Sequence, residues 1–219
     1  MRSLAIFDLD GVITSTTDAH FKAWTALFEA TYDITLDPSL EVLTRGVSRV
    51  ESLKTLHDRH GIREDEETIR MLAEQKNAHY RILIEGFTTD DLLPGAVSTI
   101  RLLNEMGCHV ALSSASRNAP FLLERLGISD LFGYVSDPGK HRGKPHPDLF
   151  EAPMRHFGMK PEECVGFEDA RAGIEAIRAA GMYAVGVGDT VLERADIHVR
   201  TLADLGEKRL RHIFEGGAS

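Results

Sequence analysis

At 219 residues the chain is long enough to bury a sizeable core, and its 42% hydrophobic and 27% charged residues are ordinary for a globular protein. Its net charge of −9 disfavours nucleic acid and anionic membranes as partners, so an anionic substrate would need a local cluster of cations. Cys108 and Cys164 lack C-x-x-C spacing, which is typical of free thiols in a reducing compartment. The longest apolar run, 179–188, is too short to span a bilayer, and Asp8 follows the N-terminus too closely for a signal peptide. We therefore expect a cytoplasmic protein.

Strand and helix patterns alternate along most of the chain. Apolar runs predict strands at 4–9, 109–113, 164–167, 182–187 and 196–199. Apolar residues at helical spacing predict helices at 95–106, 119–126, 147–157 and 170–180. Strands that alternate with helices form a parallel sheet covered on both faces. The predicted fold class is α/β with a Rossmann-like parallel sheet, and such sheets bind ligands at the carboxyl ends of their strands.

Residues 17–89, which we call the helical insert, interrupt this alternation. They contain helical patterns at 18–31, 38–44, 48–60 and 66–85 and no strand pattern. We predict that the helical insert is an all-helical cap domain inserted after the first strand. The core domain would then comprise residues 1–16 and 90–219, with hinges near 13–17 and 86–93.

Two aspartates stand at the end of the first predicted strand. Asp8 and Asp10 are two residues apart, so both can face one site while Leu9 packs elsewhere. One carboxylate can accept a phosphoryl group, and a second one nearby can act as general acid and base. A solvated strand end followed by a turn at Asp10-Gly11 is an equal alternative on these residues alone.

Three further polar clusters lie after predicted strands or in a loop. Glu168-Asp169, together with Asp8, supplies the carboxylate oxygens that Mg²⁺ prefers, although Asp169 alone would also suit a helix cap. Residues 113–118, Ser-Ser-Ala-Ser-Arg-Asn, offer hydroxyls, an amide and a cation before a helix, which is typical of a phosphate site. Lys144, beside a proline, could neutralise a transferring phosphoryl group, but most loop lysines are only solvated.

These four clusters, in this order from Asp8 to Asp169, resemble the motifs of the haloacid dehalogenase superfamily. The resemblance implies a phosphoryl-transfer enzyme in which Asp8 is the nucleophile and Asp10 the general acid and base. It also implies Mg²⁺ as cofactor, held by Asp8, Glu168, Asp169 and the backbone carbonyl of Asp10. An acid at position 10 favours phosphoryl transfer, because the dehalogenases and phosphonate hydrolases of the superfamily lack it.

A phosphomutase has to hold two phosphates, and this chain offers more cations than one phosphate site needs. Arg45-Gly46-Val47-Ser48-Arg49 places two arginines around a glycine, which suits an anion clamp or a solvated helix face. Within the superfamily the chain resembles the β-phosphoglucomutases. This implies interconversion of β-D-glucose 1-phosphate and glucose 6-phosphate through an aspartyl phosphate and β-glucose 1,6-bisphosphate. The residues then expected to contact phosphate or sugar are Thr16, His20, Trp24, Arg45, Gly46, Val47, Ser48, Arg49, Lys76, Ser114, Ala115, Ser116, Arg117, Asn118 and Lys144.

Two other functions stay open on the sequence: a sugar-phosphate phosphatase on the same scaffold, and a non-catalytic phosphate-binding protein. The chain also departs from the resemblance in places. The resemblance implies an acidic residue at position 15 of the hinge, where this chain has serine. It implies lysine at position 117, where this chain has arginine and so keeps the positive charge. Loop 139–143 is more basic than the resemblance implies. We expect a monomer whose partner is a small sugar phosphate, with neither nucleic acid nor membrane.

Overall fold

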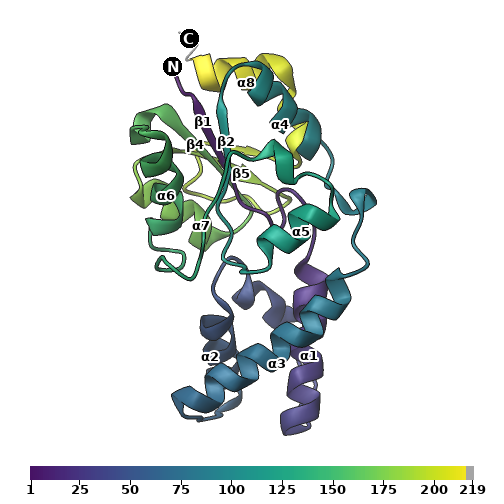
Figure 1. Ribbon diagram of the computed structural model, residues 1–219. Coiled ribbons are helices and arrows are strands. Elements are labelled where there is room, and N and C mark those ends of the chain that lie inside the picture. The colour runs from purple at the N-terminus through teal and green to yellow at the C-terminus, as the bar shows by residue number, and fades with distance from the viewer. Residues whose placement is uncertain (216–219) are drawn as a thin grey trace.

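Six parallel strands form one sheet in the computed structural model of the chain, which describes residues 1–215 (Figure 1). The strand order is β3-β2-β1-β4-β5-β6. The strands are β1 (Leu4–Phe7), β2 (His109–Leu112), β3 (Tyr134–Val135), β4 (Cys164–Glu168), β5 (Tyr183–Val187) and β6 (Ile197–Val199). The chain moves outward from β1 in both directions, so the carboxyl ends of β1, β2 and β4 lie side by side at the point where the order reverses. This arrangement confirms the predicted α/β fold.

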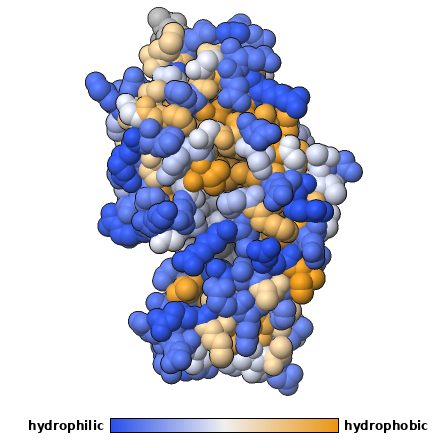
Figure 2. All heavy atoms as spheres, in the orientation of Figure 1, coloured by the Kyte–Doolittle hydropathy of each residue, from blue (hydrophilic) through white to orange (hydrophobic). Residues whose placement is uncertain are grey.

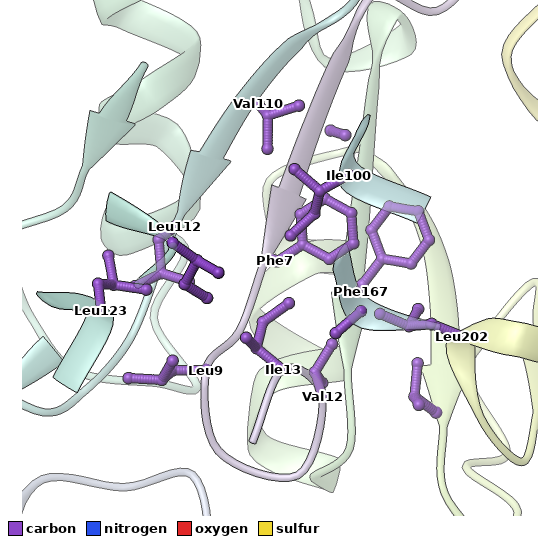
Figure 3. Close-up of a cluster of buried hydrophobic side chains, with 14 of the residues drawn as sticks. Phe7, Leu9, Val12, Ile13, Ile100, Val110, Leu112, Leu123, Phe167 and Leu202 are labelled. Atoms are coloured by element: carbon purple, nitrogen blue, oxygen red, sulfur yellow. The ribbon is translucent and has the colours of Figure 1, made fainter. Parts of the chain in front are cut away.

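Helices cover both faces of the sheet, because alternate residues of each strand point to opposite sides. These helices are α4 (Ala96–Glu105), α5 (Ala119–Arg125), α6 (Asp148–Phe157), α7 (Arg171–Ala179) and α8 (Gly206–Glu215). Leu4 and Ile6 of β1 pack in a core with α6 and α7, whereas Ala5 and Phe7 pack in a second core with α4, α5 and α8. Phe7 stacks on Phe167 of β4 with 4.3 Å between ring centroids, and Figure 3 shows this pair beside Ile100 of α4. Burying these apolar side chains on both faces fixes the strand ends that carry the polar clusters.

The helical insert lies between β1 and β2 in the chain and extends from one end of the sheet (Figure 1). It contains α1 (Thr17–Tyr32), the 3₁₀ helix η1 (Pro38–Thr44), α2 (Arg49–His60) and α3 (Glu66–Ile84). These helices share a core of their own, which includes Trp24, Phe28 and Leu53. Its separate core supports the predicted division into a core domain (1–16 and 90–219) and a cap domain (17–89), which stays a prediction.

The two connections to the helical insert run alongside each other. The Leu93 backbone N–H donates to the Ile13 carbonyl at 2.9 Å. The Thr14 hydroxyl donates to the Asp91 carbonyl at 2.7 Å. The chain therefore enters and leaves the helical insert through one narrow pair of hydrogen-bonded segments.

The structure contains two elements that the sequence patterns did not predict. Strand β3 has only two residues, too few to show a period, and it pairs with β2 through tertiary context. Helix α8 is the second, and its buried residues Leu210, Ile213 and Phe214 lie at helical spacing. Short 3₁₀ turns occur at η2 (Thr89–Asp91), η3 (Ser129–Leu131), η4 (Pro161–Glu163) and η5 (Leu202–Asp204). Among the described residues, no helix combines the length and apolar character needed to cross a membrane.

Candidate active site

Three strand ends bring the predicted polar residues together. Asp8 follows β1, Ser114 lies two residues beyond β2, and Glu168 is the last residue of β4. Backbone hydrogen bonds continue the sheet register here, because Asp8 N–H donates to the Phe167 carbonyl at 2.9 Å. Asp8, Ser114 and Glu168 are all buried, so their polar groups depend on partners within the protein.

Lys144 joins two of these strand ends. Its ammonium donates to Asp8 Oδ1 at 2.5 Å and to Glu168 Oε2 at 2.6 Å, and all three side chains are at most 5% exposed. Burial by itself would lower the pKa of Lys144, but the carboxylates of Asp8 and Glu168 outweigh it and raise that pKa above its usual value. Lys144 is therefore a fixed positive charge at the carboxylate end of the sheet rather than a solvated loop lysine.

The carboxylates of Asp8, Glu168 and Asp169 form a cluster suited to a divalent cation. Each offers an oxygen, and the three oxygens lie within 4.8 Å of one another. Burial and the charge of Asp8 raise the pKa of Asp169 to about 7 and that of Glu168 well above its usual range. A single lysine leaves this charge undercompensated. Buried hard oxygen donors with excess negative charge fit Mg²⁺.

Gly11 gives Asp169 the room that this cluster needs. Its φ is +79°, and a Cβ at this position would lie 2.1 Å from Asp169 Oδ2. Any side chain would therefore displace the carboxylate as well as strain the backbone. The turn at Asp10-Gly11 is thus compatible with a functional site at this strand end, because the turn makes space for the carboxylate of Asp169.

Asp10 adopts the geometry of an acid–base group. The Asp10 backbone N–H donates to Asp8 Oδ2 at 3.0 Å. The Thr16 hydroxyl donates to Asp10 Oδ1. Burial, followed by the charge of Asp8, raises the pKa of Asp10 to about 7. A carboxyl group with this pKa can both give and take a proton near neutral pH.

The helical insert contributes a second buried lysine. Lys76 Nζ lies 2.6 Å from His20 Nδ1, and it sits 4.7 Å from the centre of the Trp24 ring. Burial and the neighbouring Arg49 lower the pKa of Lys76 to about 7. Burial and Lys76 hold the pKa of His20 well below its usual value, so the imidazole is neutral and its Nδ1 accepts from the lysine.

The loop after β2 folds around its own hydroxyls. Ser116 N–H donates to Ser114 Oγ at 3.1 Å, and Asn118 N–H donates to Ser116 Oγ at 3.2 Å. Asn118 precedes α5 without a capping bond from its side chain. That side chain instead donates to Asn77 Oδ1 of the helical insert at 2.7 Å. The loop is therefore tied to the insert across the site.

The two arginines of the predicted anion clamp have acidic neighbours. Arg45 makes two bonds of 2.6 Å to Glu41, and Arg49 lies 3.1 Å from Glu74. Gly46 has a φ of +69° and approaches the loop after β4 so closely that a Cβ would lie 2.9 Å from that of Ala170. The glycine between the two arginines thus lies against the sheet end, and the role of the arginines as an anion clamp stays a prediction.

One pocket between the sheet end and the helical insert collects most of the predicted site residues. On the face drawn in Figure 2, the molecule narrows between these two parts and hydrophilic residues border the constriction. The predicted residues that line the pocket are Asp8, Asp10, His20, Trp24, Arg45, Gly46, Val47, Arg49, Lys76, Ala115, Ser116, Arg117, Asn118 and Asp169.

Five predicted residues lie outside the pocket lining. Four of them lie behind the lining and bond to it or to one another. Thr16 bonds to Asp10, and Ser114 accepts from the Ser116 backbone N–H. Lys144 bonds to both Asp8 and Glu168. The fifth, Ser48, uses its hydroxyl to cap α2 by accepting from Glu51 N–H at 3.3 Å.

The pocket also contains residues to which the sequence analysis gave no role. They are Thr17, Glu41, Thr44, Ser52 and Asn77. Only Glu41 carried a usable signal, because it precedes Arg45 by four residues, the spacing of a helical ion pair. The others reach the pocket through tertiary packing of the helical insert.

Comparison with known proteins gives consistent matches over nearly the whole chain. The family model of haloacid dehalogenase-like hydrolases matches residues 3–181. The β-phosphoglucomutase of Bacillus subtilis (strain 168) is 39% identical over 218 residues, which cover 96% of this chain and 94% of that protein. The fructose-1-phosphate phosphatase of Escherichia coli (strain K12) is 32% identical over 184 residues, covering 83% of this chain and 94% of that one. The crystal structure of β-phosphoglucomutase from Clostridium difficile superposes with a TM-score of 0.93 at 37% identity, covering 99% and 98% of the two chains. With these matches, and with the acids, the hydroxyl loop and the lysine gathered at one sheet end, the chain belongs to the haloacid dehalogenase-like hydrolases.

Proposed function

We propose that the chain is a β-phosphoglucomutase, which interconverts β-D-glucose 1-phosphate and glucose 6-phosphate through an aspartyl phosphate and β-glucose 1,6-bisphosphate. One observation carries the proposal: Arg49 and Arg117 line the same pocket as Asp8 and Asp10. A transferring phosphate beside Asp8 already has Lys144, so the two arginines are available for a second phosphate on the same sugar. Similarity to the Bacillus and Clostridium mutases over nearly the whole chain supports this choice.

In the proposed reaction a hydroxyl of the sugar monophosphate attacks the phosphorus of phospho-Asp8, the bond from phosphorus to Asp8 Oδ breaks, and the bisphosphate forms. After the bisphosphate has reoriented, Asp8 Oδ attacks its other phosphorus, and the bond from that phosphorus to the sugar oxygen breaks. Asp10 takes the proton of the attacking hydroxyl in the first step and gives it to the departing sugar oxygen in the second. Lys144 remains charged throughout and offsets the negative charge that develops on the phosphoryl oxygens. Mg²⁺, held by Asp8, Glu168, Asp169 and the Asp10 carbonyl, would supply further charge neutralisation.

The residues of the helical insert have a positioning role in this proposal. Arg49, with Ser116, Arg117 and Asn118 from the loop after β2, would hold the phosphate that is not transferred. Lys76 and His20 would hold the sugar hydroxyls, because the lysine offers a donor and the neutral imidazole offers both a donor and an acceptor. Closing the insert over the sheet end would exclude water from phospho-Asp8 and so favour transfer to sugar over hydrolysis.

A sugar-phosphate phosphatase is the second candidate, favoured by the similarity to the fructose-1-phosphate phosphatase of Escherichia coli. The two functions differ in the product formed from β-glucose 1-phosphate with a catalytic amount of the bisphosphate. A mutase forms glucose 6-phosphate, whereas a phosphatase releases inorganic phosphate at a comparable or higher rate. Arg49→Ala should reduce mutase turnover far more than hydrolysis of a small phosphate ester such as p-nitrophenyl phosphate. Asp8→Asn should abolish both, and retained turnover would overturn the role of Asp8.

A cytoplasmic location, a monomeric state and the absence of other partners remain predictions.

A further inference from the structure

A second cavity, which we call the side cavity, shares a wall with the pocket that collects the predicted site residues. Thr17, Arg45 and Asp169 line both spaces. Most of the remaining wall of the side cavity comes from the turn after β1, the first turn of α1 and the loops that follow β5 and β6. Its volume is about 520 Å³, against about 70 Å³ for the pocket. The proposed phosphoryl transfer gives no role to the loops after β5 and β6.

The side cavity reaches the carboxylate cluster at Asp169. Asp8 and Glu168 are 3% and 0% exposed, whereas Asp169 is half-buried. Gly11 lines the side cavity, and a Cβ on this residue would lie 2.1 Å from Asp169 Oδ2. The missing side chain of Gly11 therefore leaves the Asp169 carboxylate at the border of the side cavity. Since the cluster oxygens lie within 4.8 Å of one another, an ion at this border is already next to the other two acids.

The charge of the side cavity favours a cation. Its charged lining residues are Asp18, Arg45, Asp169, Asp189, Arg200 and Asp204. Arg45 is paired with Glu41 at 2.6 Å, and Arg200 is paired with one of the aspartates, Asp189, at 3.0 Å. The other three aspartates therefore make the lining negative. A cavity lined by one sign of charge concentrates ions of the opposite sign, whereas the arginines of the neighbouring pocket attract phosphate.

We propose that the side cavity is the route by which the divalent cation reaches and leaves the carboxylates of Asp8, Glu168 and Asp169, while the sugar phosphate uses the pocket with the arginines. The two ligands then approach the sheet end through openings of opposite charge, so neither has to pass the other. A sugar phosphate that fills the smaller pocket leaves the path of the cation open. The inference rests on the metal site of the proposed function.

The first test narrows the side cavity without altering a metal ligand. Ser15→Phe and Thr190→Phe, combined in one variant, add rings to its lining from two segments. Val191→Phe is the matched control, because Val191 is the neighbouring residue and is 71% exposed. Circular dichroism and the melting temperature verify that each variant is folded. Mn²⁺ is the probe, since it takes the same oxygen ligands as Mg²⁺ and its free ion is measured by electron paramagnetic resonance.

Two quantities are measured: the Kd of Mn²⁺ by titration, and its release rate from the loaded protein into excess chelator by stopped flow. An obstacle in the route slows entry and exit equally and leaves the equilibrium unchanged. We therefore expect release to slow about fivefold or more in the double variant with Kd changed less than about twofold, and both to be unchanged in Val191→Phe. Release at the wild-type rate overturns the proposal, as does a tighter Kd that accounts for slower release.

The second test reverses one charge of the side cavity. Asp18→Lys is compared with Asp130→Lys, which changes the net charge equally but lies before β3, at the opposite edge of the sheet from β6. The association rate constant of Mn²⁺, which is the release rate divided by Kd, should fall about threefold or more in Asp18→Lys alone at low ionic strength. The difference should shrink in about 0.5 M salt because salt screens exposed charges. Equal association rates in the two variants overturn the proposal.

Failure of the route and failure of the proposed function give different results. If the wild type binds no Mn²⁺ in the titration, the metal site fails and the inference fails with it. If the wild type binds Mn²⁺ but the double variant releases it at the wild-type rate, only the route is wrong. Neither measurement depends on whether the protein forms glucose 6-phosphate or releases inorganic phosphate.

Discussion

Replacing Lys144 by methionine should destabilise the protein far more than a loop substitution normally does. Lys144 bridges the carboxylates of Asp8 and Glu168, and the three side chains are 0%, 5% and 0% exposed. Methionine is similar in length, so little cavity forms and the main change is the loss of the positive charge. Lys144→Met leaves two buried carboxylates beside each other without their shared ammonium.

The magnitude follows from burial. Removing one partner of a buried ion pair costs about 3–5 kcal/mol, because the remaining charge is desolvated and uncompensated. In a chain of this size each 1 kcal/mol lowers the melting temperature by about 2–4 °C, so we expect a fall of about 6–20 °C. An exposed ion pair would contribute at most about 1 kcal/mol. The two cases are therefore separable by an ordinary melting or urea experiment.

The assay is urea unfolding followed by circular dichroism, in EDTA, with Lys140→Met as the control. Lys140 belongs to the same loop, but its side chain is 76% exposed and 3.5 Å from Asp137, so its removal should change little. Without Lys144 the folded-state pKa of Glu168 rises further above its unfolded value, because the ammonium that opposes this rise is gone. The folded variant then binds more protons than the unfolded chain. The loss of unfolding free energy relative to the wild type should therefore become smaller as pH falls from 8 to 5. A deficit below about 1 kcal/mol, or one that is independent of pH, would refute the reasoning.

Two further predictions concern the second lysine and the metal. The pKa of Lys76 is lowered to about 7, so between about pH 7 and 10 the folded chain binds fewer protons than the unfolded one, and this residue makes stability rise with pH by up to ~1.4 kcal/mol per unit. Lys76→Met should remove that slope from the pH dependence of urea unfolding, and equal slopes in variant and wild type would contradict it. Millimolar Mg²⁺ should raise the melting temperature of the wild type, and Asp169→Asn should lose most of this shift. An undiminished shift would remove Asp169 from the metal ligands.

The strand-end residues were predictable from sequence because their positions are set locally. Asp8 and Glu168 each follow or end an apolar run, and the carboxyl ends of neighbouring parallel strands meet at one edge. Buried strands that are long enough to show a pattern therefore predict both the fold and the position of the acidic residues at the strand ends. Strand β3 shows the limit, since two residues carry no period.

The supporting contacts were not predictable, because they join distant segments whose approach depends on tertiary packing. Nothing in the residues around Lys144 indicates that its ammonium spans Asp8 and Glu168. The bond between Asn118 and Asn77 depends on how the helical insert packs against the sheet end. Sequence identified these residue types through a resemblance, while their geometry follows from packing between the two parts of the chain.

The distribution of charge explains why one pocket can treat two phosphates differently. At the sheet end, the acids Asp8, Asp10, Glu168 and Asp169 outnumber Lys144, so a phosphate bound there needs an additional cation. On the opposite side of the pocket the arginines dominate. Their acidic partners differ: Glu41 beside Arg45 lines the pocket with a side chain that is 20% exposed, whereas the side chain of Glu74 beside Arg49 is 65% exposed. An exposed partner holds an arginine weakly, so a phosphate can compete for Arg49. We therefore expect a phosphate at the acidic end to react with Mg²⁺ as the additional cation, and a phosphate at the arginine end only to be held, as a bisphosphate intermediate requires.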